Sequence, residues 1–288
     1  MAVGSELPRL DGYPFEVRYS EGALARATAA ADVAANAYVY FRHLFSGVEP
    51  DIAVIVADQL DWSGKGPYGL PFFNDDAHQI RPGIVVMPAG GGDFWTAIAQ
   101  DLRDTTPRGY ARLRTTYPDG NGGVDLQPFF DLITIHEFGH AFEVLGDLRL
   151  PTFWLSEIFV NLAMYAFVAT QMPESLPILE TLPTVGAASR RLAARMRADG
   201  YSTLEDLQAH YTGGDDSMSP LNYIWYQYRW LRLVAKVFEV DGEDVLVRFW
   251  DCFHATDRAT TGATAASLAP LLAAEVSPTF GRAIRDWR

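Results

Sequence analysis

Apolar residues fall into strand-like runs early in the chain and into helical runs later. An alanine-rich segment, Gly22 to Phe45, predicts a long helix, and two continuous apolar runs after it, Ile52–Ala57 and Gly83–Pro88, have the length of buried strands. The segment Phe129 to Leu145 is apolar over most of a helical surface, which is typical of a buried helix. Beyond Glu157 the pattern is helical throughout. It therefore predicts an α+β protein with a small mixed sheet in its N-terminal part and an all-helical C-terminal part.

The apolar helix predicted at 129–145 carries His136, Glu137 and His140 in the arrangement H-E-x-x-H. Residues four apart on a helix share a face, so both imidazoles can bind one metal ion. Glu137 lies where it can reach a water on that metal without ligating it, as zinc-dependent hydrolysis requires. An ordinary core helix with two satisfied histidines is the alternative interpretation, but burial of these groups is costly without a partner.

A catalytic zinc ion usually takes three protein ligands, so a third ligand is expected. The metzincin continuation of the motif is excluded, because Glu143 and Gly146 stand where that pattern requires glycine and histidine. Glu143, one turn beyond His140, is one alternative. The better candidate is Glu157, seventeen residues after His140, which leaves room for a short loop and a second helix packed antiparallel on the first. Asn161 shares its helix face and is expected to accept a hydrogen bond from a ligand histidine.

These residues, His136-Glu137-x-x-His140 followed by Trp154-x-x-Glu157-x-x-x-Asn161, resemble the gluzincin branch of the zincin metallopeptidases, which includes thermolysin-like and aminopeptidase-N-like enzymes. The resemblance covers about residues 130–165. It implies a zincin-like fold, one Zn²⁺ ion and a peptide or protein substrate. Two departures are visible. Ile158 replaces the small residue often found after the ligand glutamate, and the spacing to Glu157 is a few residues shorter than in the best-known members.

The same resemblance implies two features outside the motif. In that group a tyrosine of a downstream helix stabilises the oxyanion; Tyr226 fits the distance to Gly242 best, with Tyr223 second. A sheet edge ahead of the zinc-binding helix pairs with the bound peptide, and Met87–Gly92 is the candidate for that edge. The alternatives are that the tyrosines only pack a helix and that Met87–Gly92 is a plain turn.

Composition limits the partners. The net charge of −13 disfavours nucleic acid and anionic membrane surfaces, both of which require clustered Lys and Arg. The single Cys252 excludes an intramolecular disulfide and a cysteine-rich zinc site. Neither a signal peptide nor a membrane-spanning helix is expected, so the sequence predicts a soluble, cytoplasmic protein.

The sequence therefore predicts an N-terminal α+β subdomain over 1–146 that ends in the zinc-binding helix, and a helical subdomain over 147–288 that carries the third ligand. The expected function is a zinc-dependent metallopeptidase in which Glu137 deprotonates the zinc-bound water. Two alternatives stay open: a catalytically inactive zincin-fold binding or regulatory module, and a purely structural zinc site.

Overall fold

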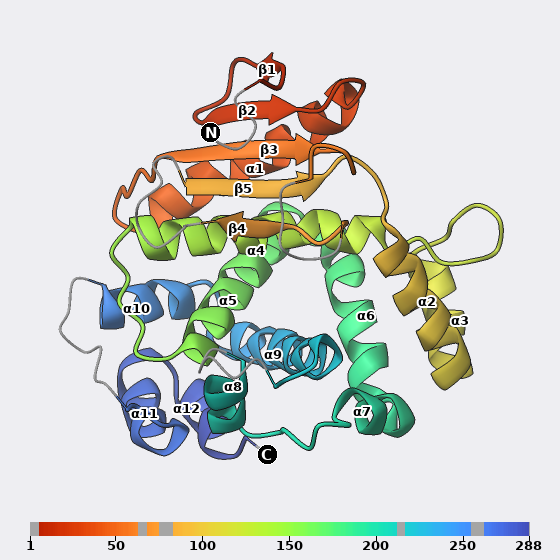
Figure 1. Cartoon of the computed structure of the whole chain (residues 1–288). Helices are drawn as coiled ribbons and strands as arrows, with labels where there is room; N and C mark the ends of the chain where they lie inside the picture. Colours follow the sequence, from red (N-terminus) through yellow and green to blue (C-terminus); the bar gives the residue numbers. More distant parts are fainter. Residues whose placement is uncertain (1–5, 63–67, 75–82, 212–216, 255–261, 288) are drawn as a thin grey trace. The chain divides into compact units, whose positions relative to one another are not determined.

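The computed structural model describes residues 6–62, 68–74, 83–211, 217–254 and 262–287. The chain forms two compact units (Figure 1). The first unit comprises Met1–Gln100 and Val124–Asp147, and the second comprises Asp101–Gly123 and Leu148–Arg288. A five-stranded mixed sheet lies in the N-terminal part and the C-terminal part is helical, so the α+β prediction is confirmed.

The sheet of the first unit is built on two parallel strands that the apolar runs predicted, β3 (Ile52–Ala57) and β5 (Gly83–Pro88). Every residue of both strands is buried, which explains why they read as continuous apolar runs. β2 (Glu16–Tyr19) pairs parallel with β3, while β1 (Arg9–Leu10) and β4 (Phe72–Asn74) pair antiparallel at the two edges. These three strands were not predicted, because they are too short to show an alternation of apolar and polar residues.

Helices α1 (Leu24–Leu44) and α4 (Gln127–Leu145) of the first unit pack on the sheet, and α2 (Asp93–Thr105) begins in the first unit and ends in the second. Helices α1 and α4 occupy the segments that the sequence predicted. They pack through aromatic rings: Phe142 of α4 lies with its ring centroid 5.5 Å from those of Tyr38 and Phe41 of α1. Such burial of aromatic surface fixes α4 against α1.

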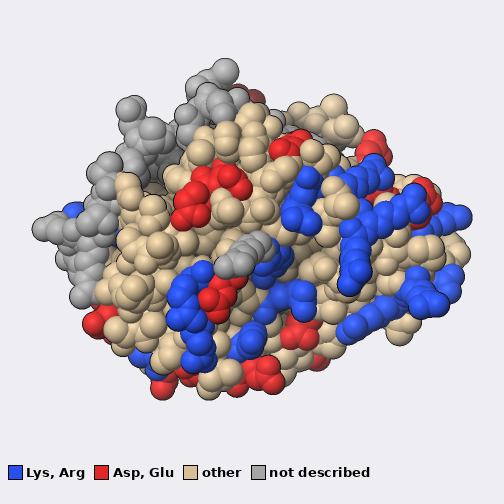
Figure 2. Space-filling model, turned by 90° about the horizontal axis from the view of Figure 1, so that it is seen from below, with Lys and Arg blue, Asp and Glu red and all other residues tan. Residues whose placement is uncertain are grey.

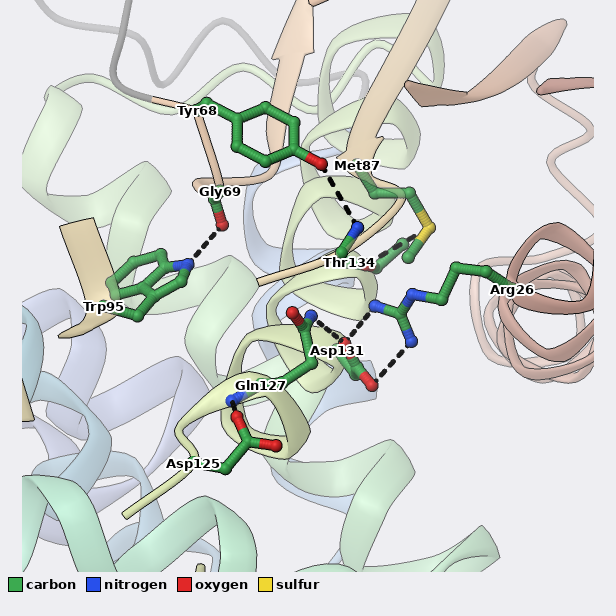
Figure 3. Close-up of polar contacts among 10 residues, drawn as sticks. Arg26, Tyr68, Gly69, Met87, Trp95, Asp125, Gln127, Asp131 and Thr134 are labelled. Atoms are coloured by element: carbon green, nitrogen blue, oxygen red, sulfur yellow. Dashed lines mark hydrogen bonds and ion pairs between the residues drawn. The ribbon is translucent and has the colours of Figure 1, made fainter. Parts of the chain in front are cut away.

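Polar contacts also position α4 (Figure 3). Arg26 of α1 donates from Nη1 to Asp131 Oδ2 at 2.8 Å, and Gln127 Nε2 donates to Asp131 Oδ1 at 2.7 Å. One turn further along, the Thr134 hydroxyl contacts Met87 Sδ of β5 at 3.9 Å. The N-terminal half of α4 is therefore tied to both a helix and a strand of its own unit.

The regular elements described for the second unit are helices, and an isolated bridge joins Leu148 to His254. Its α-helices are α3 (Pro107–Thr116), α5 (Phe153–Gln171), α6 (Leu176–Ala188), α7 (Arg190–Met196), α8 (Leu204–His210), α9 (Pro220–Asp241), α10 (Asp244–Phe253), α11 (Ala265–Leu271) and α12 (Pro278–Arg285). A 3₁₀ turn at Pro173–Ser175 precedes α6, and a π-helical turn at Leu272–Val276 follows α11. Helix α9 packs against both α5 and α6, and the core of this unit includes Trp154, Phe159, Trp230 and Trp250.

One helix within the described residues, α5, is long and apolar enough to cross a membrane by length and composition alone. Of its apolar window, 78% is buried inside the structure. A mostly buried helix of this kind is also what the core of a soluble protein contains, so α5 is weak evidence for a membrane span.

Candidate metal centre

The two histidines of the H-E-x-x-H motif lie on one face of α4. Their ring centroids are 5.0 Å apart and the rings are nearly perpendicular. The His136 side chain is buried, with 5% of the residue exposed. As predicted from their spacing of four residues, the two imidazoles lie close together on the same face of the helix.

Glu143 lies one turn beyond His140 and contacts that imidazole. His140 Nδ1 is 3.0 Å from Glu143 Oε2, and because an ionised carboxylate can only accept, Nδ1 carries the hydrogen and donates it. This leaves Nε2 of His140 as the nitrogen that can bind a metal. Glu143 was considered as a third ligand; the structure instead places it where it orients a ligand.

Glu137 points toward the sheet of its own unit. Its Oε2 accepts a hydrogen bond from the backbone N–H of Phe73 in β4 at 2.8 Å. Glu137 is only partly buried and does not belong to the group of residues whose donor atoms converge. Its carboxylate is thus held in place by backbone while remaining open to water, which suits a proton acceptor.

The sheet edge nearest to Glu137 is β4, not Met87–Gly92 as expected. Met87 lies in β5, which is an interior strand with β3 on one side and β4 on the other. Among the glycines that follow β5, Gly92 has a packing reason: a Cβ there would lie 2.3 Å from the carbonyl oxygen of Tyr68. Trp95 Nε1 fixes the same turn by donating to the Gly69 carbonyl at 2.6 Å (Figure 3).

The expected third ligand, Glu157, lies in α5 of the second unit. The helix begins at Phe153, where the Thr152 side chain caps it by accepting from the N–H of Leu155. Glu157 is 3% exposed and Asn161, one turn later, is 1% exposed. Two polar side chains this deeply buried on an apolar helix need specific partners.

Gln227 of α9 provides those partners, and its role was not predicted from the sequence. Its Nε2 donates to Glu157 Oε2 at 2.7 Å and to the Tyr223 hydroxyl oxygen at 2.6 Å. Its Oε1 accepts from Asn161 Nδ2 at 2.9 Å, and this bond fixes which way the Gln227 amide points. The expectation that Asn161 supports a histidine is therefore corrected: its amide nitrogen holds Gln227 and also donates to the Glu157 carbonyl at 2.7 Å.

The hydrogen bonds of the two candidate tyrosines show which of them lies at the candidate site. Tyr226, the first choice from sequence, donates its hydroxyl to the Thr203 carbonyl at 2.7 Å and is fully buried. Tyr223 lies beside Glu157 and Gln227, and its ring stacks on Tyr211 with centroids 4.3 Å apart. Tyr223 is therefore the tyrosine of the candidate site.

The Tyr223 hydroxyl is held in its protonated form. Burial raises its pKa well above the ordinary value, and the nearby negative charge of Glu157 raises the pKa further. Gln227 Nε2 donates to the phenolic oxygen, and a hydrogen bond from the Tyr223 hydroxyl to the Glu157 carboxylate also raises the pKa.

The donor atoms of His136, His140 and Glu157 all lie within 4.8 Å of one another. These three side chains can hold a metal ion, and they are the ligand set that the sequence predicted. No protein-family model, curated protein or solved structure significantly matches the chain. The residues of the site are therefore what a functional proposal rests on.

Proposed function

We propose that the protein is a zinc-dependent hydrolase of peptide bonds, a metallopeptidase of the zincin type. The observation that carries the proposal is the convergence of two imidazoles and one carboxylate within 4.8 Å, with Glu137 on the same helix and outside that ligand set. A structural zinc site normally has four protein ligands and no adjacent base. Three ligands together with a separate carboxylate favour a catalytic site.

The chemistry of the donor set fits zinc. Two nitrogen ligands and one carboxylate oxygen form a combination that zinc accepts, with a position left for water or substrate. Glu157 is 3% exposed, and a buried carboxylate is strongly stabilised by a bound cation. The Glu143 carboxylate, which accepts from His140 Nδ1, would make Nε2 a better ligand. When bound, zinc would supply a Lewis acid that activates water and polarises a carbonyl.

The other residues then have distinct roles. Glu137 accepts a proton from the attacking water and passes it to the leaving amine. The hydrogen bond from the Phe73 N–H to Oε2 holds the Glu137 carboxylate in place. The Tyr223 hydroxyl donates a hydrogen bond to the carbonyl oxygen as negative charge develops on it. Gln227 donates to both Tyr223 and Glu157 and so fixes the positions of their side chains relative to each other.

Hydrolysis of a mixed peptide library by wild type and by Glu137→Gln tests the proposal. The glutamine keeps the shape and can still accept from Phe73 N–H, but it cannot take a proton. We expect an activity at least about 10³-fold lower with unchanged zinc content. Glu21→Gln, at an exposed position of the same unit, is the matched control and should retain full activity.

Two results would contradict the proposal. Equal activity of wild type and Glu137→Gln would remove Glu137 from the reaction. Stoichiometric zinc in wild type without hydrolysis of any library peptide would favour the binding or regulatory module instead.

A further inference from the structure

The negative charge of the chain is not uniform over its surface. The chain has 36 Asp and Glu against 23 Lys and Arg. Figure 2 nevertheless shows Lys and Arg side chains gathered in a band across one face. Several of the helices of the second unit carry exposed basic residues, among them α7, α9 and α12. A concentration of cations in an acidic protein identifies this face as a candidate for binding anions.

Part of this band surrounds a groove between α9 and α12 of about 540 Å³. The cationic residues that line it are Arg229, Arg232, Lys236 and Arg282. The one acidic residue that lines it, Asp286, forms an ion pair with Arg285 at 3.0 Å. The apolar part of the lining includes Val237 and Trp287. Positive charge therefore predominates around the groove.

Arg229 is fixed in the groove by two indole rings. Its guanidinium carbon lies 4.1 Å from the ring centroid of Trp287 and 4.7 Å from that of Trp225. Cation–π contacts of this kind hold the planar guanidinium group against the ring faces. Burial lowers the pKa of Arg229, and the nearby positive charge of Arg197 lowers it further.

Three other cations of the groove carry charge that no ion pair offsets. Arg232, Lys236 and Arg282 form no ion pair with any described acidic residue. Arg282 makes only a long contact, 3.3 Å, to the Thr279 hydroxyl of its own helix. Glu180 and Glu239 line a separate cavity, on which Arg232 and Lys236 also border. A ligand with several negative charges would relieve the repulsion among these cations.

We propose that this groove binds a phosphate group, either of a soluble phosphorylated compound or of a lipid headgroup. Guanidinium groups match phosphate oxygens with paired hydrogen bonds, and an ammonium group such as that of Lys236 adds a mobile charge. The indole faces of Trp225 and Trp287 are covered by guanidinium groups, so stacking of a nucleobase on them is disfavoured. The recognised feature is the phosphate itself. This site is independent of the proposed metal centre.

Calorimetric titration with inorganic pyrophosphate tests the proposal. The variant R232E/K236E reverses two charges of the groove. R190E/R191E makes the same change in net charge at two exposed positions of α7 that do not line it. We expect saturable binding to wild type, at least about tenfold weaker binding to R232E/K236E, and wild-type affinity in R190E/R191E. Circular dichroism of each variant confirms that it is folded.

A second arm identifies the source of the phosphate. Cosedimentation with phosphatidylcholine vesicles that contain phosphatidic acid, lost only in R232E/K236E, would support a lipid headgroup. Binding of pyrophosphate alone would support a soluble ligand. The proposal is overturned if neither probe binds, if both variants weaken binding equally, or if R232E/K236E binds like wild type.

Discussion

Helices α4 and α5 are matched in length and differ in how their polar residues are held. Both are 19 residues long, and both are apolar over most of their surface. In α4, His140 is oriented by Glu143, three residues away on the same helix. In α5, Glu157 is held by Gln227, a residue 70 positions further along the chain.

The arrangement of the histidines on α4 is therefore local, whereas the arrangement around Glu157 depends on tertiary structure. The histidines of α4 face one another because of helical geometry alone, once the helix forms. The carboxylate of Glu157 is oriented only if α9 packs on α5, which brings Gln227 and Tyr223 beside it. Substitutions in α9 should therefore disturb the second half of the site and leave the pair of histidines intact.

The largest expected effect in α9 is that of Tyr223→Phe. Removal of a hydroxyl that stabilises developing negative charge should lower kcat by about 10²-fold, because one such donor contributes a few kcal/mol. KM and zinc content should change little. Steady-state kinetics on a peptide substrate measures this effect, and unchanged kcat would remove Tyr223 from the mechanism.

In α4, Glu143→Gln should weaken zinc binding by about tenfold, since loss of a carboxylate that supports a ligand histidine reduces its basicity. Competition with a chelator of known affinity measures the change. Glu21→Gln again serves as the exposed control of the same unit. Undiminished affinity in Glu143→Gln would mean that the contact with His140 does not tune the metal centre.

In α9, Gln227→Met should weaken zinc binding by somewhat less than tenfold, because it removes a hydrogen bond from an uncharged amide to Glu157 and not a charged group. It should also lower kcat, because Tyr223 loses the same partner. Gln171→Met, at the exposed end of α5, is the control. A change in kcat without any change in zinc affinity would show that Gln227 acts on Tyr223 alone.

Tyr226→Phe has the smallest expected effect on function. Its hydroxyl donates to the Thr203 carbonyl, so the variant should keep full activity and lose about 1 kcal/mol of unfolding free energy. Urea denaturation with a parallel activity assay measures both. Loss of activity here, with normal activity in Tyr223→Phe, would restore the assignment that the sequence favoured.

The contrast between the helices also explains what could be predicted from sequence. The spacing of His136, Glu137 and His140 is local, and the apolar helix around them is long enough to be recognised. Glu157 could be proposed because a carboxylate in so apolar a segment requires a reason. The role of Gln227 could not be predicted, because the sequence of α9 does not indicate which helix this polar side chain contacts. Strand β4 was missed because its three residues show no period.

Asn161 illustrates the same limit. The sequence showed that it shares a helix face with Glu157, and the structure confirms that both are buried. The partner differs from the expected histidine: Asn161 Nδ2 donates to the amide oxygen of Gln227, which lies 66 residues away in the chain. The burial of a side chain can be predicted from the apolar pattern of its own helix. Its hydrogen-bond partner depends on which other helix packs against it.

Metal analysis of purified wild type, His140→Ala, Glu157→Ala and the exposed-histidine control His43→Ala tests the central claim most directly. We predict about one zinc ion per chain in wild type and in His43→Ala, and loss of zinc in both ligand variants, because each removes one of three donors. Zinc retained in full by Glu157→Ala, or wild-type protein that takes up no zinc when it is supplied, would contradict the three-ligand centre.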